Sequence, residues 1–142
     1  MNDYDLRIVE PEFNNAFEVG LKTNFADNKG LFNLTGFLYD YQDLQVLQVV
    51  NGRIGANNAS NVNSTGIEVE TSYEIAEGFT LGGNLAIVNA EYEDFQTDDA
   101  DYSGNQTIYT PKTTWRLNAA FNKPMNNGMR FYIQGDYNYT GD

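Results

Sequence analysis

Two residue types that carry much of protein chemistry are missing from this chain of 142 residues: it has no Cys and no His. Without Cys there is no disulfide framework, no thiolate metal site and no Cys nucleophile. Without His, the commonest general base and the commonest transition-metal ligand are missing as well. We therefore predict that the protein is not an enzyme and holds no cofactor.

Basic residues and long apolar runs are also scarce. Lys and Arg number 8 against 20 Asp and Glu, which gives a formal net charge of −12. Nucleic-acid binding rests on neutralising phosphates with basic side chains, so this balance argues against nucleic acid as a partner. No stretch approaches the roughly 18 consecutive apolar residues of a membrane helix, and helical periodicity is weak throughout.

What the chain does have is alternation. From Phe17 to Phe25 the odd positions are apolar or Thr, and the even positions are charged, polar or Gly. A period of two is typical of a strand with one apolar face and one wet face. The pattern returns along the chain and predicts six strands, at about 15–26, 31–46, 62–75, 79–92, 113–122 and 129–139.

The connections between these strands alternate in length. Short turns are expected at 27–30, 76–78 and 123–128, and long polar loops at 49–61 and 93–109. In bacterial outer-membrane barrels the short turns are periplasmic and the long loops extracellular. Ten residues tilted by about 45° rise about 24 Å, which matches an apolar band of about 25 Å. The pattern thus predicts an all-β fold, an antiparallel up-and-down transmembrane β-barrel segment of about six strands.

Aromatic residues gather near both ends of the predicted strands, as in the girdles of a membrane barrel. The long-loop side has Tyr39, Tyr41, Tyr92, Phe95, Tyr109, Tyr137 and Tyr139. The short-turn side has Phe25, Phe32, Tyr73, Phe79, Phe121 and Phe131. Alternating strands also build soluble sandwiches, so a soluble or surface-attached β-sheet module with a structural or adhesive role is the alternative.

Short segments resemble, in order, parts of the barrel of TonB-dependent outer-membrane receptors. They are Pro11-Glu12 with Phe17–Lys22, Gly36–Val46, Asn58-Ala59 with Gly66–Glu70, Leu81–Phe95, Thr110–Lys112 and Tyr137–Gly141. The segments occur in the same order as in the family, and the ordered set covers about residues 11–141. The resemblance implies that residues 1–142 form part of a larger barrel of about 22 strands, with no plug domain among them.

The resemblance also implies a function. Such receptors are active transporters of the bacterial outer membrane, which import a scarce nutrient such as a ferric siderophore with energy from the TonB complex. The implied partners are outer-membrane lipid, a small-molecule ligand, and the TonB complex acting through a plug and N-terminal segment. Independently, six strands are fewer than the eight of the smallest bacterial barrels, and open edges in lipid would leave unpaired backbone groups costing several kcal/mol each.

Three groups of residues are candidate sites. Four tyrosines could stack on a ligand near the long loops, with an interface girdle as the alternative for each: Tyr39, Tyr41, Tyr92 and Tyr109. Asp99, Asp101 and Ser103 place oxygen atoms at alternate positions before Gly104, as in the first half of a calcium loop. A solvated acidic loop is the alternative there, because Thr110 stands where a bidentate Glu would complete the site.

The third group is a row of glutamates on one predicted strand, Glu68, Glu70 and Glu74. Paired carboxylates can serve acid–base catalysis, but no His or Cys supports that role here. We expect the row to belong to a water-filled inner wall, with Arg116, Arg130 or a plug domain as candidate partners.

Overall fold

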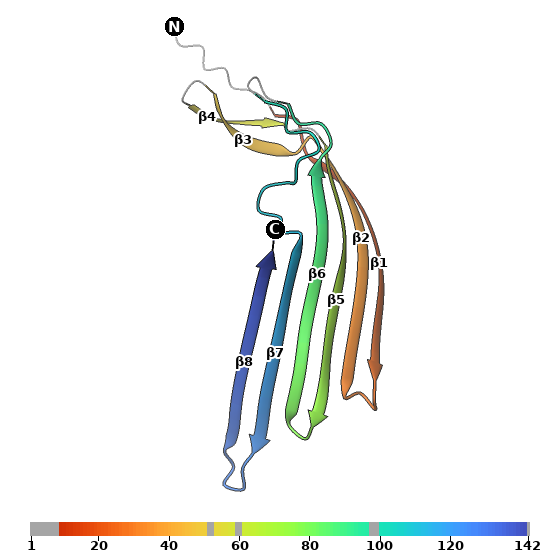
Figure 1. The fold of residues 1–142 in the computed structure, drawn as a ribbon, viewed down its shortest axis with the longest axis vertical. Helices are drawn as coiled ribbons and strands as arrows, with labels where there is room; N and C mark the ends of the chain where they lie inside the picture. Colours follow the sequence, from red (N-terminus) through yellow and green to blue (C-terminus); the bar gives the residue numbers. More distant parts are fainter. Residues whose placement is uncertain (1–8, 51–52, 59–60, 97–99, 142) are drawn as a thin grey trace. The chain divides into compact units, whose positions relative to one another are not determined.

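A computed structural model describes residues 9–50, 53–58, 61–96 and 100–141 (Figure 1). Within these ranges the chain forms strands joined by turns and loops, and no helix there is long and apolar enough to cross a membrane. The strands are β1 (Phe13–Phe25), β2 (Gly30–Gln42), β3 (Gln45–Val50), β4 (Arg53–Asn58), β5 (Val62–Ala76), β6 (Phe79–Tyr92), β7 (Thr113–Pro124) and β8 (Arg130–Gly141). Six of them make one sheet in the order β1-β2-β5-β6-β7-β8, and β3 pairs with β4 in a second sheet.

This order confirms the predicted all-β fold, because the six long strands are those expected from the alternation and neighbours in the sheet are successive long strands. The chain divides into two compact units. Unit 1 contains Met1–Phe17, Leu38–Ser64 and Asn89–Thr110, and unit 2 contains Glu18–Phe37, Thr65–Val88 and Pro111–Asp142. The two units are described separately below.

In unit 2 the register of the strands separates the two faces of the sheet. Asn84 pairs with Arg116, which in turn pairs with Asn138, so these polar residues share one face. One position along each strand, Leu85 pairs with Trp115 and Trp115 with Tyr139 on the other face. The predicted alternation of β6, β7 and β8 is therefore confirmed, with one wet face and one apolar face.

The short turns of unit 2 fall where the sequence predicts them. Three consecutive residues between β1 and β2 have positive φ, namely Ala26, Asp27 and Asn28, and the Lys29 N–H donates to the Ala26 carbonyl over 3.1 Å. Between β5 and β6, Gly78 has φ +74°, which suits a residue without a side chain. Its carbonyl accepts a hydrogen bond of 2.8 Å from the Asn122 N–H of β7.

Unit 1 differs from the prediction after β2. The sequence predicted one strand from 31 to 46 and a polar loop over 49–61, whereas β2 ends at Gln42 and a β3–β4 hairpin follows. Asp43 at φ +56° interrupts the extended backbone, and Val50 then pairs with Arg53. The run Gln45–Val50 is rich in β-branched residues and precedes Asn51-Gly52, a strong hairpin signal in the sequence. Because residues 51–61 are mostly polar, the sequence predicted a loop there in place of a hairpin.

The second predicted loop is folded back on β6. Glu91 bridges to Gln106 and Gln96 to Asp101, and the Thr107 N–H donates to the Ala90 carbonyl over 2.9 Å. Val62, Ala90 and Tyr92 are the buried hydrophobic residues of the described ranges, and all three belong to unit 1. This small core lies among β5, β6 and the loop that follows β6.

Candidate functional site

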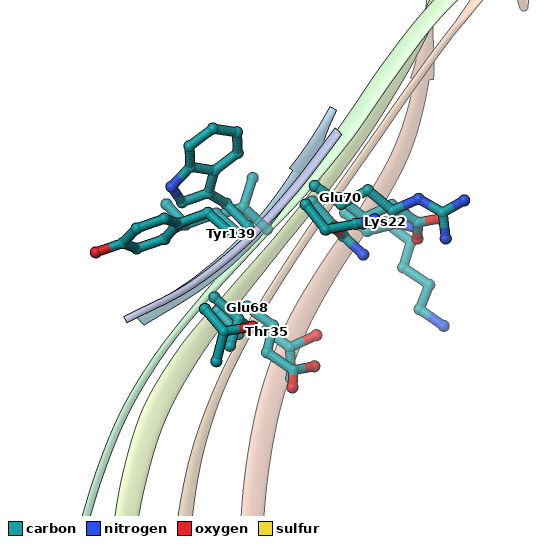
Figure 2. A pocket seen from close by; sticks show the side chains of 15 residues that line it. Lys22, Thr35, Glu68, Glu70 and Tyr139 are labelled. Atoms are coloured by element: carbon teal, nitrogen blue, oxygen red, sulfur yellow. The ribbon is translucent and has the colours of Figure 1, made fainter. Parts of the chain in front are cut away.

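An open hollow lies over the wet face of the sheet in unit 2. Its volume is about 650 Å³, and all six strands of the long sheet, β1, β2, β5, β6, β7 and β8, contribute residues to its lining. The polar lining consists of Lys22, Asn33, Thr35, Glu68, Glu70, Asn84, Thr114, Arg116, Asn138 and Thr140. Figure 2 shows Lys22 and Glu70 on one side of the strands, and Tyr139 on the other. The lining also includes the apolar and aromatic residues Val69, Leu85, Ala86, Trp115 and Tyr139, so the hollow combines amides, hydroxyls and charges of both signs with apolar surface.

Asn33 and Glu70 form a cross-strand contact in this hollow. The Asn33 Nδ2 donates to Glu70 Oε2 over 2.8 Å. The other amide atom, Asn33 Oδ1, is buried and has no hydrogen-bond partner among the described residues. Because a buried acceptor without a donor is costly, this oxygen is suited to receive a hydrogen bond from water or from a molecule in the hollow.

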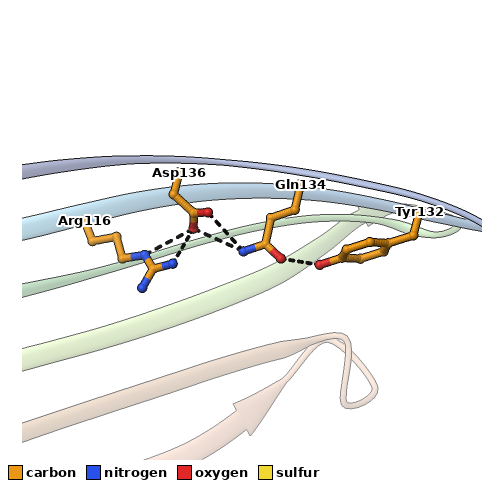
Figure 3. A network of polar contacts seen from close by, with 4 residues as sticks. All are labelled: Arg116, Tyr132, Gln134 and Asp136. Carbon is orange, nitrogen blue, oxygen red and sulfur yellow. Dashed lines mark hydrogen bonds and ion pairs between the residues drawn. The ribbon is translucent and has the colours of Figure 1, made fainter.

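A chain of polar contacts continues along the same face on β7 and β8 (Figure 3). Arg116 donates to Asp136 Oδ1 from two nitrogens, Nη2 at 2.5 Å and Nε at 3.1 Å. The Gln134 Nε2 donates to both oxygens of Asp136 at 3.1 and 3.2 Å, and the Tyr132 hydroxyl donates to Gln134 Oε1. These alternate residues of β8 hold the Arg116 guanidinium in one orientation beside the hollow.

Two of the three glutamates of β5, Glu70 and Glu74, have partners other than the arginines that the sequence suggested. Arg116, a candidate partner for them, pairs with Asp136 on β8. Glu74 Oε1 accepts from the Gly78 N–H over 2.9 Å and so stabilises the turn after its own strand. Glu70 accepts from Asn33, as described above. The row is therefore divided between a turn and the hollow, and Asp136 and Asn33 are the polar residues that the sequence did not single out.

The apolar face carries aromatic contacts instead. The Trp115 ring lies 5.5 Å from both the Tyr137 and the Tyr139 ring, centroid to centroid. Nearer the short turns, Phe121 lies 6.5 Å from Phe79 and 6.2 Å from Phe131. These rings cover neighbouring strands on the apolar face of the sheet, and Trp115 and Tyr139 also contribute to the lining of the hollow.

The four candidate tyrosines all lie in unit 1 but in different environments. Tyr39 and Tyr41 are half-buried and meet edge to face at 6.3 Å. Tyr92 is only 6 % exposed and packs on Phe95 at 4.9 Å. Tyr109 is 97 % exposed and has φ +62°. Its ring is thus the most accessible of the four.

The candidate calcium residues are described only in part, because Asp99 lies outside the described residues. Asp101 Oδ1 accepts from the Ser103 N–H over 2.9 Å, and Oδ2 accepts from Gln96 Nε2 over 3.4 Å. The hydrogen bonds from Ser103 lower the pKa of the Asp101 carboxyl below its ordinary value. Ser103 Oγ also accepts from the Phe95 N–H, so both residues help to fold this loop.

Comparison with known families agrees with this geometry. The family model described as "TonB dependent receptor-like, beta-barrel" matches residues 2–142. The match covers nearly the whole chain and includes all six strands of the long sheet. Proteins with this barrel are receptors and transporters of the bacterial outer membrane rather than enzymes. The chain belongs to the TonB-dependent receptor-like β-barrel family.

Proposed function

We propose that this chain forms wall and outer loops of an active transporter that imports a scarce nutrient, such as a ferric siderophore, across the bacterial outer membrane. The family match over residues 2–142 carries the proposal. The two-faced sheet supports it, because a transporter wall needs an apolar face for lipid and a wet face for the lumen. In this proposal the TonB complex supplies the energy, and a plug domain outside residues 1–142 acts as the gate.

The ligand contact that we propose is Tyr109. Its ring is almost fully exposed on a loop held by hydrogen bonds, since Thr107 Oγ1 donates to Thr110 Oγ1 over 3.0 Å and Gln106 Nε2 donates to the Thr110 carbonyl. A tyrosine ring has few rotatable bonds, so it gives a ligand a large contact area at a small entropy cost. Tyr39 and Tyr41 are the next candidates, as a pair, because part of each ring is accessible.

An uptake assay tests both statements. Under iron limitation, cells that lack the protein should take up less labelled ferric siderophore than cells that have it. When the TonB complex is disrupted in both strains, their uptake should become equal. Tyr109→Ser should raise the ligand concentration for half-maximal uptake, whereas Tyr92→Phe, which keeps the packing on Phe95, should not. Uptake that does not depend on the protein, across a panel of nutrients, would count against the transporter role.

A further inference from the structure

The apolar face of unit 2 carries two aromatic clusters with different chemistry. The Trp115 cluster comprises Trp115, Tyr137 and Tyr139, and the Phe121 cluster comprises Phe79, Phe121 and Phe131. Every ring of the Trp115 cluster bears an N–H or O–H group, and no ring of the Phe121 cluster does. Trp and Tyr favour the boundary between lipid and water because one end of each ring system is polar, whereas Phe has no such polar end.

The spacing along β7 gives the difference in depth between the clusters. Trp115 and Phe121 are six positions apart on β7, an even number, so their side chains lie on the same face, as do those of their partners Tyr139 and Ile133 on β8. Six residues of strand span about 20 Å, and a tilt of about 45° reduces this to about 14 Å along the membrane normal. This depth is well short of the apolar band of about 25 Å. Two clusters so close together cannot both lie at opposite edges of the band.

The far edge of the band falls on the turn between β7 and β8 if Trp115 marks the near edge. At that tilt a band of about 25 Å takes about 11 residues of strand, counted from Trp115. This count ends in the turn after Pro124, where Met125 and Met129 are both about half exposed. The cationic residues Lys123 and Arg130 flank the turn and suit the polar layer beyond the hydrocarbon.

We propose that the Trp115 cluster contacts the lipid headgroup layer on the long-loop side, while the Phe121 cluster is embedded among the acyl chains. The second boundary then lies at the β7–β8 turn and not at the phenylalanines. This placement rests on the proposed transporter role, and it revises the expectation that Phe79, Phe121 and Phe131 belong to a girdle at the short-turn interface.

Depth-dependent quenching of tryptophan fluorescence tests this placement. Trp115 is the only tryptophan of the 142 residues, so it can report its own depth in the protein reconstituted into phosphatidylcholine vesicles. Any tryptophan outside these residues would be changed to phenylalanine. Trp115→Phe combined with Phe121→Trp moves the reporter to the second cluster. The matched control, Trp115→Phe with Asn118→Trp, places the reporter on the wet face between them.

We expect the order of quenching by the two brominated lipids to be opposite for the reporters at positions 115 and 121. Lipid brominated near the headgroup should quench Trp115 more than lipid brominated deep in the chain does, and the order should be opposite for the tryptophan at 121. The tryptophan at 118 should be quenched by neither lipid. Equal depths for 115 and 121, or a shallow position for 121, would overturn the placement but leave the transporter role standing. Quenching of none of the reporters by either lipid would overturn both.

Discussion

Arg116 on β7 and Asp136 on β8 form a two-bond ion pair across neighbouring strands, although they are not directly opposite in register. Asn138 is opposite Arg116, and Asn118 is opposite Asp136, so the pair is diagonal. The guanidinium thereby leans along the wet face toward Gln134 and away from its direct partner. This contact links the two last strands of the sheet beyond their backbone ladder.

We predict a measurable but small coupling between these two residues. Arg116 and Asp136 are 49 % and 29 % exposed, and pairs at such sites usually contribute about 0.2–1 kcal/mol. A double-mutant cycle with Arg116→Ala and Asp136→Ala, measured by urea unfolding in vesicles, should give a coupling in that range that declines with added salt. Lys22→Ala with Asp136→Ala is the control and should be additive, because Lys22 lies on β1. Additivity of the first pair would contradict the ion pair.

Gly66→Ala should destabilise the sheet by about 1–3 kcal/mol, because the added methyl group has no room. A Cβ at Gly66 would overlap the Phe37 ring and would lie 2.7 Å from the Ile87 carbonyl oxygen, which cannot move without moving β6. Gly135→Ala is the matched control, since a Cβ there meets nothing within 4 Å. Unfolding in denaturant should separate the two variants clearly, and equal stability would rule out the close approach at Gly66.

Gly78 and Gly104 allow the cost of backbone conformation to be separated from the cost of crowding. Both have positive φ, +74° and +76°, where a residue other than glycine costs about 1 kcal/mol. A Cβ at Gly104 would meet nothing, whereas one at Gly78 would overlap the Asn122 carbonyl. Gly78→Ala should therefore lower the free energy of unfolding more than Gly104→Ala. The reverse order in an unfolding assay would refute this account of the β5–β6 turn.

We predict that acid lowers the stability of the loop after β6, because Asp101 becomes protonated. Hydrogen bonds from the Ser103 side chain and backbone hold its pKa below 3.8 in the folded loop. Since the pKa is depressed on folding, the stabilising contribution is complete above pH 3.8 and is lost as the pH falls through the folded value. Carboxyl NMR titration should show this low pKa, and Ser103→Ala should raise it toward 3.8 while the backbone hydrogen bond remains. An unchanged pKa in the variant would exclude the side-chain contribution.

The faces of the sheet could be predicted from the sequence because a strand has a fixed period of two. Phe121 and Ile133, for example, were assigned to the apolar face of their strands and are partners in the register. The Arg116–Asp136 pair could not be predicted in the same way. A diagonal contact depends on the register between two strands, and the register depends on turn geometry that composition does not define.

The β3–β4 hairpin was missed for a different reason. Its signal, a β-branched run before Asn51-Gly52, is local and was present in the sequence. The Asn-rich stretch that follows resembles a solvated loop, and Asp43 at φ +56° ends β2 before the apolar run begins. A left-handed residue at a non-glycine position has only a weak sequence signature. The boundary between β2 and β3 could therefore not be predicted from the sequence.

The order of the strands in the long sheet affects how barrels of this family can change during evolution. Each strand of the sheet pairs with the next long strand in the chain, and β3 and β4 are inserted between β2 and β5 without changing that order. Surface connections tolerate insertions far better than paired strands do. During evolution, a barrel of this kind can thus gain, lose or exchange an outer hairpin by a single insertion or deletion in the gene. New binding surfaces can therefore arise while the pairing of the long strands stays the same.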